Sequence, residues 1–293
     1  MKPTSLTALL AAWCVCAFAA EDPAYFIFDG SPVAAKYVSG KLIRLPPQDA
    51  SDLEKIKNLE AVSGLMRASR LSVLSPSGQK LPHLSAPQLP GYGVAMFDVA
   101  LEGLETKGRQ PATLIWSGPA RFSEVALTLP GAASRGNKAL VTRSRRLVAP
   151  MLDFRAYEPV GRRLQVEGPV SVLDHGRTPV APHLTFVDVT WRIKDLPEAL
   201  SDRGIDSTSP FIRVEFVIDT ATGKTVYQNI ENTGGTEGRS MRLLREGNGP
   251  LLMAVRIGCS DGAEPLLLDL GRESYGTGRP GDVPPSLHCF PGR

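Results

Sequence analysis

FIRVEFVIDTATGKTVYQNI, residues 211–230, is the stretch that decides the fold of this chain. Its first half alternates between apolar and polar side chains, which is the period of a β-strand with one buried and one wet face. The residues from Asp219 to Lys224 favour a tight turn, and a second strand-like run follows from Thr225 to Ile230. We therefore predict an antiparallel hairpin whose first strand is half-buried. Its apolar face is Ile212, Val214, Phe216 and Ile218, and its outward face is Arg213, Glu215 and Asp219.

The strand pattern continues on both sides of the hairpin. Short apolar runs recur at intervals of about 8–15 residues and are separated by Gly, Pro and Ser clusters, as in β-sandwich and barrel proteins. We predict a mainly β fold built from antiparallel β-sandwich-like domains. The other predicted strands are 25–28, 41–45, 71–74, 94–101, 112–116, 122–129, 138–148, 164–166, 170–173, 184–193, 241–244, 251–257 and 266–270.

One segment has the period of an amphipathic helix instead. Ser51 is a favourable N-cap, and Glu54 stands three residues later, which completes a capping box. Pro46 and Pro47 exclude an earlier start. We predict one helix, from about 52 to 68. Its apolar face is Leu53, Ile56, Leu59, Val62, Leu65 and Met66.

The length of the chain allows two small domains or one large one. Pro and Gly residues between 148 and 163 interrupt the strand pattern, so we place a boundary there. The expected organisation is a β-rich domain at 21–150, which contains the helix, and a β-sandwich-like domain at 151–293. A single larger sandwich is the alternative.

The first 20 residues have the pattern of an export signal. Lys2 gives a basic start, an uncharged run follows from Leu6 to Val15, and small residues at 17 and 19 resemble a cleavage site. The run is about ten residues long, too short for a permanent membrane anchor. We expect a periplasmic or secreted protein with no transmembrane span after cleavage. The chain contains no Asn-x-Ser/Thr sequence, which fits a bacterial source.

Two cysteines, Cys259 and Cys289, follow the predicted signal. Two thiols in an oxidising compartment most often form a disulfide, and we predict this bridge. Closing a loop of this length stabilises a fold by about 3–4 kcal/mol. The alternative is a metal site with His288 as a further ligand, but that ligand set is incomplete, so no metal is expected.

The sequence GCSDG at 258–262 matches the Gly-x-Ser-x-Gly pattern of a nucleophile elbow. His288, with Asp282 or Asp269, would complete a serine–acid–histidine order. However, no alternation of strands and helices precedes the motif, as an α/β-hydrolase sheet requires. A structural turn next to the predicted disulfide is the simpler interpretation. A secreted serine hydrolase that uses Ser260 and His288 is the alternative.

The histidine and acidic side chains on or near strands have no metal-binding or cofactor motif around them, so no cofactor is expected. A metal or acid–base site from His175, His183 and Asp188 is an alternative to the simpler setting of polar turns. Asp188 and Glu215 fall on predicted outward faces, together with Arg213. We expect cross-strand ion pairs on a wet sheet face, each of little energetic weight.

The sequence TRSRR at 142–146 is the densest basic patch. Arg143, Arg145 and Arg146 are candidate contacts to anionic lipid or lipopolysaccharide. The alternative is a solvated strand edge, where charge discourages pairing with other strands.

The composition narrows the class of function. The chain carries 33 basic and 30 acidic residues, a balance that argues against nucleic-acid binding. Our leading hypothesis is an exported bacterial envelope protein that acts as a non-enzymatic binding or assembly module, with an envelope protein or glycan as partner. One alternative is a secreted hydrolase that uses Ser260 and His288, or the carboxylates Asp188 and Glu215 as a glycosidase would. The other is an inhibitor or immunity-type partner of another exported protein.

Overall fold

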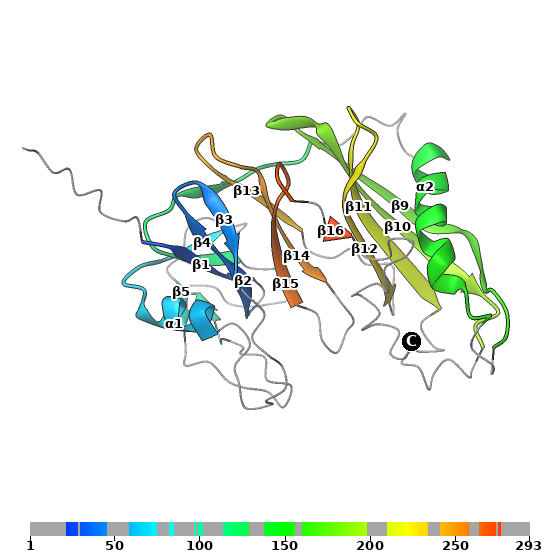
Figure 1. Ribbon diagram of the computed structural model, residues 1–293, viewed down its shortest axis with the longest axis horizontal. Helices are drawn as coiled ribbons and strands as arrows, with labels where there is room; N and C mark the ends of the chain where they lie inside the picture. Colours follow the sequence, from blue (N-terminus) through cyan, green and yellow to red (C-terminus); the bar gives the residue numbers. More distant parts are fainter. Residues whose placement is uncertain are drawn as a thin grey trace, which may run out of the picture.

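The computed structural model is a stack of three β-sheets with one helix packed at each end (Figure 1). The prediction of a mainly β, antiparallel, sandwich-like fold is confirmed, although the described residues contain two α-helices where one was predicted. The structure describes residues 22–28, 30–45, 59–74, 82–84, 97, 99–101, 114–128, 138–155, 160–197, 210–233, 241–257, 264–273 and 275–276.

The three sheets have simple strand orders. Sheet I has the order β3-β2-β1-β7-β4, and sheet II, in the middle of the stack, has the order β15-β14-β13-β8. Sheet III has the order β16-β12-β11-β10-β9, in which β12 and β16 are parallel and the other neighbours antiparallel. β5 and β6 form a separate pair. The strands are β1 Ala24–Phe28, β2 Ser31–Val38, β3 Lys41–Arg44, β4 Leu71–Leu74, β5 Pro82–Leu84, β6 Val99–Leu101, β7 Leu114–Ser117, β8 Phe122–Glu124, β9 Gln165–Thr178, β10 Ala181–Lys194, β11 Phe211–Asp219, β12 Thr225–Thr233, β13 Arg242–Glu246, β14 Leu252–Ile257, β15 Glu264–Asp269 and β16 Tyr275–Gly276.

Clusters of buried apolar side chains fill the spaces between the layers. Alternate residues of one strand enter different clusters, because successive side chains point to opposite faces of a sheet. In β1, Phe26 packs between sheets I and II, whereas Ile27 packs toward the helix at that end. In β10, Phe186 packs toward sheet II and Trp191 packs toward the helix at the other end. Apolar packing therefore lies on both faces of each of the three sheets.

The predicted hairpin is confirmed as β11 and β12, which are neighbours in sheet III. Its turn is closed by hydrogen bonds from Asp219 N to Lys224 O, 2.9 Å, and from Gly223 N to Asp219 O, 2.7 Å. Gly223 has a φ of 71°, a conformation that glycine adopts without a steric penalty. The Asp219 carboxylate also accepts bonds from Ala221 N at 2.9 Å and Thr222 Oγ1 at 2.8 Å. The turn residues thus set the register of the two strands.

The prediction that β11 is half-buried is wrong. Its four apolar residues do share one buried face, as predicted. The opposite face is buried as well, because Val217 packs against sheet II and Arg213 is only 3% exposed. The alternation in the sequence correctly separated the two faces of the strand, but it did not reveal that both are covered.

The helix predicted at 52–68 is confirmed over α1, Leu59–Arg67, while residues 51–58 lie outside the described residues. Gly64 allows α1 to approach sheet I closely, because a Cβ at this position would lie 2.2 Å from a ring carbon of Tyr25. The buried residues of α1 are Ala61, Val62 and Leu65.

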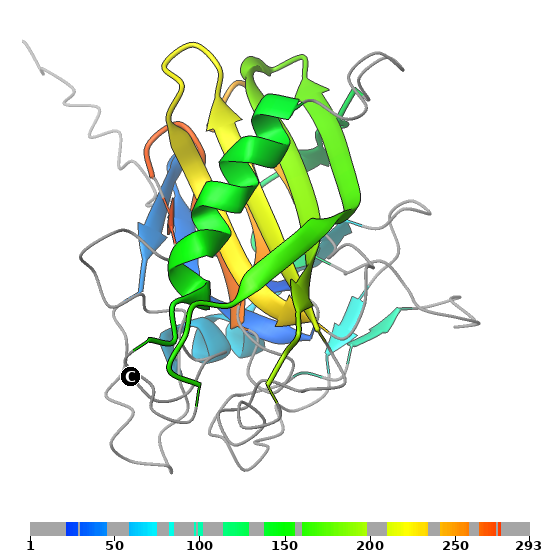
Figure 2. The ribbon, with the colours of Figure 1, turned by 90° about the vertical axis from the view of Figure 1, so that its right-hand side faces the viewer.

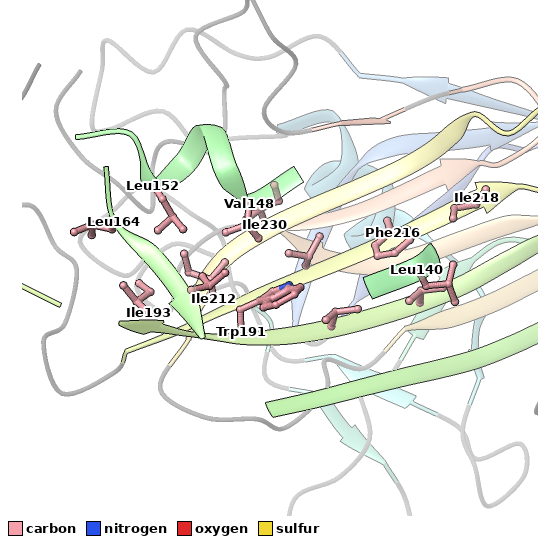
Figure 3. Packing of buried hydrophobic residues seen from close by; sticks show 14 residues of the cluster. Leu140, Val148, Leu152, Leu164, Trp191, Ile193, Ile212, Phe216, Ile218 and Ile230 are labelled. Atoms are coloured by element: carbon pink, nitrogen blue, oxygen red, sulfur yellow. The ribbon is translucent and has the colours of Figure 1, made fainter. Parts of the chain in front are cut away.

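The strand predicted at 138–148 is wrong, because these residues form the helix α2, Lys138–Val148, followed by the 3-10 turn η2, Ala149–Leu152. The buried residues Leu140, Ser144 and Val148 recur every four positions, which places them on one helix face. α2 lies across the outside of sheet III (Figure 2), and its apolar residues pack around Trp191 (Figure 3). Neither described α-helix is long and apolar enough to cross a membrane.

Contacts cross the predicted boundary between 21–150 and 151–293. β8 pairs with β13 in sheet II, and the cluster between sheets I and II contains Phe26 from one side of the boundary and Leu252 from the other. α2, which comes just before the boundary, packs on sheet III. The boundary itself stays a prediction.

Candidate functional site

The residues of the predicted serine site and of the predicted disulfide lie outside the described residues. This applies to Ser260, His288 and Asp282, and to Cys259 and Cys289. The hydrolase and the disulfide therefore stay predictions.

The structure does not bring His183 and Asp188 together. Both belong to β10, and their separation of five positions corresponds to roughly 16 Å along a strand. His183 is exposed, whereas Asp188 is 3% exposed. The side chain of His175 lies outside the described residues. Within the described ranges, no three His, Cys, Asp or Glu side chains are grouped as a metal site would require.

A group of polar side chains occupies the face of sheet III that points toward sheet II. Asp188, Glu215 and Asn229 stand in one row across β10, β11 and β12, and Thr190 pairs with Arg213 in the next row. Glu215 is half-buried, and the other four are each at most 3% exposed. We call these five residues the charged cluster. They begin where the apolar contacts with sheet II end, one row beyond Phe186, Val217 and Tyr227.

The two carboxylates of the charged cluster have different partners. Arg213 Nε lies 3.5 Å from Asp188 Oδ2, which makes a buried ion pair. Asn229 Nδ2 and Tyr227 OH donate to Glu215 Oε2 at 3.4 and 3.3 Å. Within the described part of the chain, Asp188 Oδ1 has no hydrogen-bond partner. Asp188 is therefore paired with a positive charge, and Glu215 accepts hydrogen bonds from two neutral donors.

Burial raises the pKa of Asp188 to about 7, because a carboxylate is poorly solvated inside a protein. The negative charge of Glu215 raises the pKa further, and the positive charge of Arg213 lowers it. Asp188 thus exchanges its proton near neutral pH, which an exposed aspartate does not do.

The charged cluster corrects the prediction of ion pairs on a wet sheet face, since the Asp188–Arg213 pair is buried.

The raised pKa of Asp188 raises the question of whether this carboxyl acts as a catalytic acid. A raised carboxyl pKa is common in catalytic acids, but the group has to reach its substrate. Asp188 is 3% exposed and is a direct cross-strand neighbour of Glu215 on one face, so the two carboxyls do not flank a cleft as a glycosidase pair does. The geometry favours a structural role for this pair.

The second candidate surface is the outer face of α2. Lys138, Arg145 and Arg146 are exposed there, and the eleven residues of α2 include no acidic side chain. None of these three cations makes a hydrogen bond or ion pair within the described part of the chain. Arg145 and Arg146 lie in the last turn, where positive charge interacts favourably with the helix dipole.

Arg143 and Ser144 hold α2 in place. Arg143 Nη2 donates to Gly223 O at 2.9 Å and to Thr225 Oγ1 at 2.6 Å, which ties α2 to the hairpin turn. Trp191 Nε1 donates to Ser144 Oγ at 3.1 Å in the buried interface. Of the three arginines predicted as contacts, Arg143 is therefore half-buried and used within the protein, whereas Arg145 and Arg146 remain exposed.

More positive charge follows α2 in the chain. Arg155 and Arg163 both pair with Asp153 Oδ2, at 2.6 and 2.9 Å. Their hydrogen bonds, with that of Arg155 the stronger influence, hold the pKa of Asp153 well below its usual range. The Asp153 carboxylate thus forms ion pairs with two guanidinium groups. We call the exposed cations of this region the basic cap: Lys138, Arg145, Arg146, Arg155, Arg162 and Arg163.

The basic cap dominates the charge of the molecule. Residues 138–163 contain seven basic and two acidic residues, a net charge of +5. The whole chain carries +3, so all other residues together carry −2. The excess positive charge therefore lies in α2 and the segment that follows it, at one end of the stack (Figure 1).

No protein-family model, no curated protein and no solved structure matches this chain. The sequence did identify the basic run of the cap, although on a strand. It did not reveal the charged cluster, because the burial of these side chains depends on chain segments that are distant in sequence. The available signal was the presence of Asp188, Arg213 and Glu215 within strands that are otherwise rich in large apolar residues.

Proposed function

We propose that this protein is an exported bacterial envelope protein that acts as a non-enzymatic binding or assembly module, and that its contact surface is the basic cap. The observation that carries the proposal is the concentration of charge. Residues 138–163 carry +5 while the remainder of the chain carries −2. An exposed cluster of one sign attracts and orients a partner of the opposite sign.

The division of roles among the residues of α2 supports a binding surface, because the residues that hold the helix in place are not its exposed cations. The structural bonds of α2 use Arg143 and Ser144, and its packing uses the apolar face. Among the residues that the structure describes, Arg145 and Arg146 take no part in either. The helix dipole accounts for a preference for positive charge in the last turn, but it does not require Lys138 in the first turn or Arg155, Arg162 and Arg163 beyond the helix. A polyanionic component of the envelope is the partner that this surface fits.

Charge reversal tests the proposed contact surface. The full chain is expressed for export, and the protein is purified from the periplasm of a bacterial host. Binding to immobilised dextran sulfate is compared with binding to uncharged dextran. We expect wild-type protein to bind only the sulfated polymer, and R145E/R146E to lose most of that binding.

The matched control is K41E/R70E, which makes the same change of charge at exposed positions outside α2 and sheet III. It should retain most of the binding to dextran sulfate. Equal losses in the two double variants would contradict a localised contact surface. Retention of the protein in the cytoplasm of the host would contradict the proposed export.

The proposed disulfide and the non-enzymatic assignment have separate tests. The intact protein should be two hydrogen atoms lighter before reduction than after it, if Cys259 and Cys289 are bridged.

If the protein is not a serine hydrolase, a fluorophosphonate should not label it. Labelling that disappears in Ser260→Ala would replace the binding module with the serine hydrolase.

A further inference from the structure

We infer that the basic cap docks on the surface of an anionic phospholipid bilayer, with α2 lying on the headgroups and no part of its outer face inserted. This inference rests on the proposed function and names the partner of the same surface. It follows from the shape of the outer face of α2, from the lack of large apolar side chains on that face and from the distribution of charge.

The shape of the outer face of α2 excludes a small anion as the preferred ligand. The exposed residues are spread along a helix of eleven residues, which is roughly 16 Å long. Lys138 and Arg145 are about two turns apart, or roughly 10 Å along the axis. A site for a single phosphate has donors that converge on one point, whereas these cations lie along a convex rod. An extended array of negative charges matches that arrangement.

The composition of the same face argues against a protein partner. Its exposed residues are Lys138, Ala139, Thr142, Arg145 and Arg146, with no aromatic or large aliphatic side chain among them. Stable protein interfaces have an apolar core inside a polar rim. The large apolar residues of α2 are used against sheet III instead, as Leu140 and Val148 show in Figure 3.

The absence of large apolar side chains from the exposed face of α2 also determines how the helix would lie on a bilayer. Amphipathic helices that insert between headgroups bury an apolar face in the membrane. The apolar face of α2 points into the protein, so its attachment is electrostatic and reversible. The net charge of −2 on the rest of the chain disfavours the opposite orientation. The protein therefore stands on a membrane by its α2 end.

The experiment is sedimentation with vesicles. The periplasmically purified protein is mixed with vesicles of phosphatidylcholine alone, or of phosphatidylcholine with phosphatidylglycerol, in roughly 0.05 M and 0.5 M sodium chloride. We expect binding to the anionic vesicles at low salt, and loss of that binding at high salt. Exposed basic residues near such a surface contribute about fivefold each, so R145A/R146A should weaken partitioning about 25-fold. The control K41A/R70A should stay within about twofold of wild type, because those side chains are outside the cap.

The outcomes separate this inference from the proposed function. Cap-dependent binding to dextran sulfate without binding to anionic vesicles would overturn the lipid inference and leave the binding module intact, with an acidic glycan or protein as partner. Failure to bind either polyanion would overturn both. Binding to vesicles that persists at high salt, or that is equal for phosphatidylcholine, would overturn electrostatic docking. Circular dichroism of each variant checks whether its fold is retained.

Discussion

The two faces of sheet III are built by the same strands but carry opposite chemistry. The face toward α2 is apolar, with Trp191, Ile212 and their neighbours in one continuous cluster (Figure 3). The face toward sheet II is apolar over part of its area and then changes to the charged cluster, with Asp188 and Arg213 buried side by side. Most side chains in both regions are buried, but only the face toward sheet II contains a buried ion pair.

This difference has consequences for stability. Shortening a buried apolar side chain destabilises the protein in two ways. The fold loses the transfer free energy of the removed atoms, and a cavity remains where they were. Neither effect depends on pH. A buried ion pair behaves differently, because removing one partner leaves the other charge without compensation. Substitutions on the two faces should therefore change the free energy of unfolding differently, with a dependence on pH only on the charged face.

The largest effect is expected from Arg213→Met. The substitution removes the positive charge beside Asp188 and retains much of the apolar volume, so it should lower the free energy of unfolding by about 3–5 kcal/mol. Urea denaturation at pH 8 measures this loss. Arg192→Met is the matched control, because Arg192 is exposed on the neighbouring strand, and it should change stability by less than about 0.5 kcal/mol. Equal effects in both variants would show that Arg213 is not a buried partner.

Ile212→Ala tests the apolar face. Ile212 is fully buried, and its truncation should lower the free energy of unfolding by about 3 kcal/mol. The buried residues of this cluster carry no acidic or basic group, so the loss should be the same at pH 5 and pH 8. Val170→Ala, at a position that is 47% exposed, provides the control. If the decrease in the free energy of unfolding caused by Ile212→Ala varied strongly with pH, the two faces would not differ in their response to pH.

Asp188→Asn tests the titration of the charged face. The native pKa of about 7 lies above the unfolded value of 3.8, so the native state keeps a proton that the unfolded state releases between these values. The contribution of Asp188 to stability is therefore full below pH 3.8 and is lost as the pH rises toward 7. We expect a decrease of about 2 kcal/mol between pH 5 and pH 7 from this group, measured by urea denaturation. The asparagine variant should lack that part of the decrease.

The control for the titration is Asp153→Asn. The pKa of Asp153 is lowered by Arg155 and Arg163, so this carboxyl stays ionised throughout the range from pH 5 to pH 7. The variant should keep the wild-type dependence of stability on pH. If Asp188→Asn also kept it, Asp188 would not be the group that titrates.

The smallest effect is expected from Ser144→Ala. The substitution removes the hydrogen-bond acceptor of the buried Trp191 indole, which should cost about 1 kcal/mol. Ser123→Ala is the control, because the Ser123 hydroxyl donates to Arg245 O at 3.2 Å in an exposed position. Thermal unfolding of both variants compares them. Equal stability of the two would mean that the bond to Trp191 adds nothing beyond packing.

The sequence by itself determined the features that depend on neighbouring residues. The alternation in β11 and the turn residues Asp219 and Gly223 predicted the central hairpin, since strand period and turn conformation are local properties. The apolar spacing around Val62 and Leu65 predicted α1 for the same reason. In α2 the local signals competed. The four-residue spacing of Leu140, Ser144 and Val148 is helical, but the Gly, Pro and Ser clusters between the apolar runs led to the prediction of a strand.

Only the tertiary structure decided which faces are covered. Arg213 alternates with apolar residues as an exposed side chain would, yet it is buried with Asp188 because the burial of a strand face depends on chain segments that are distant in sequence. The same holds for the basic cap. The arginines are visible in the sequence, but their exposure follows from the way α2 turns its apolar side, Leu140 and Val148 included, toward sheet III and leaves Arg145 and Arg146 on the outside.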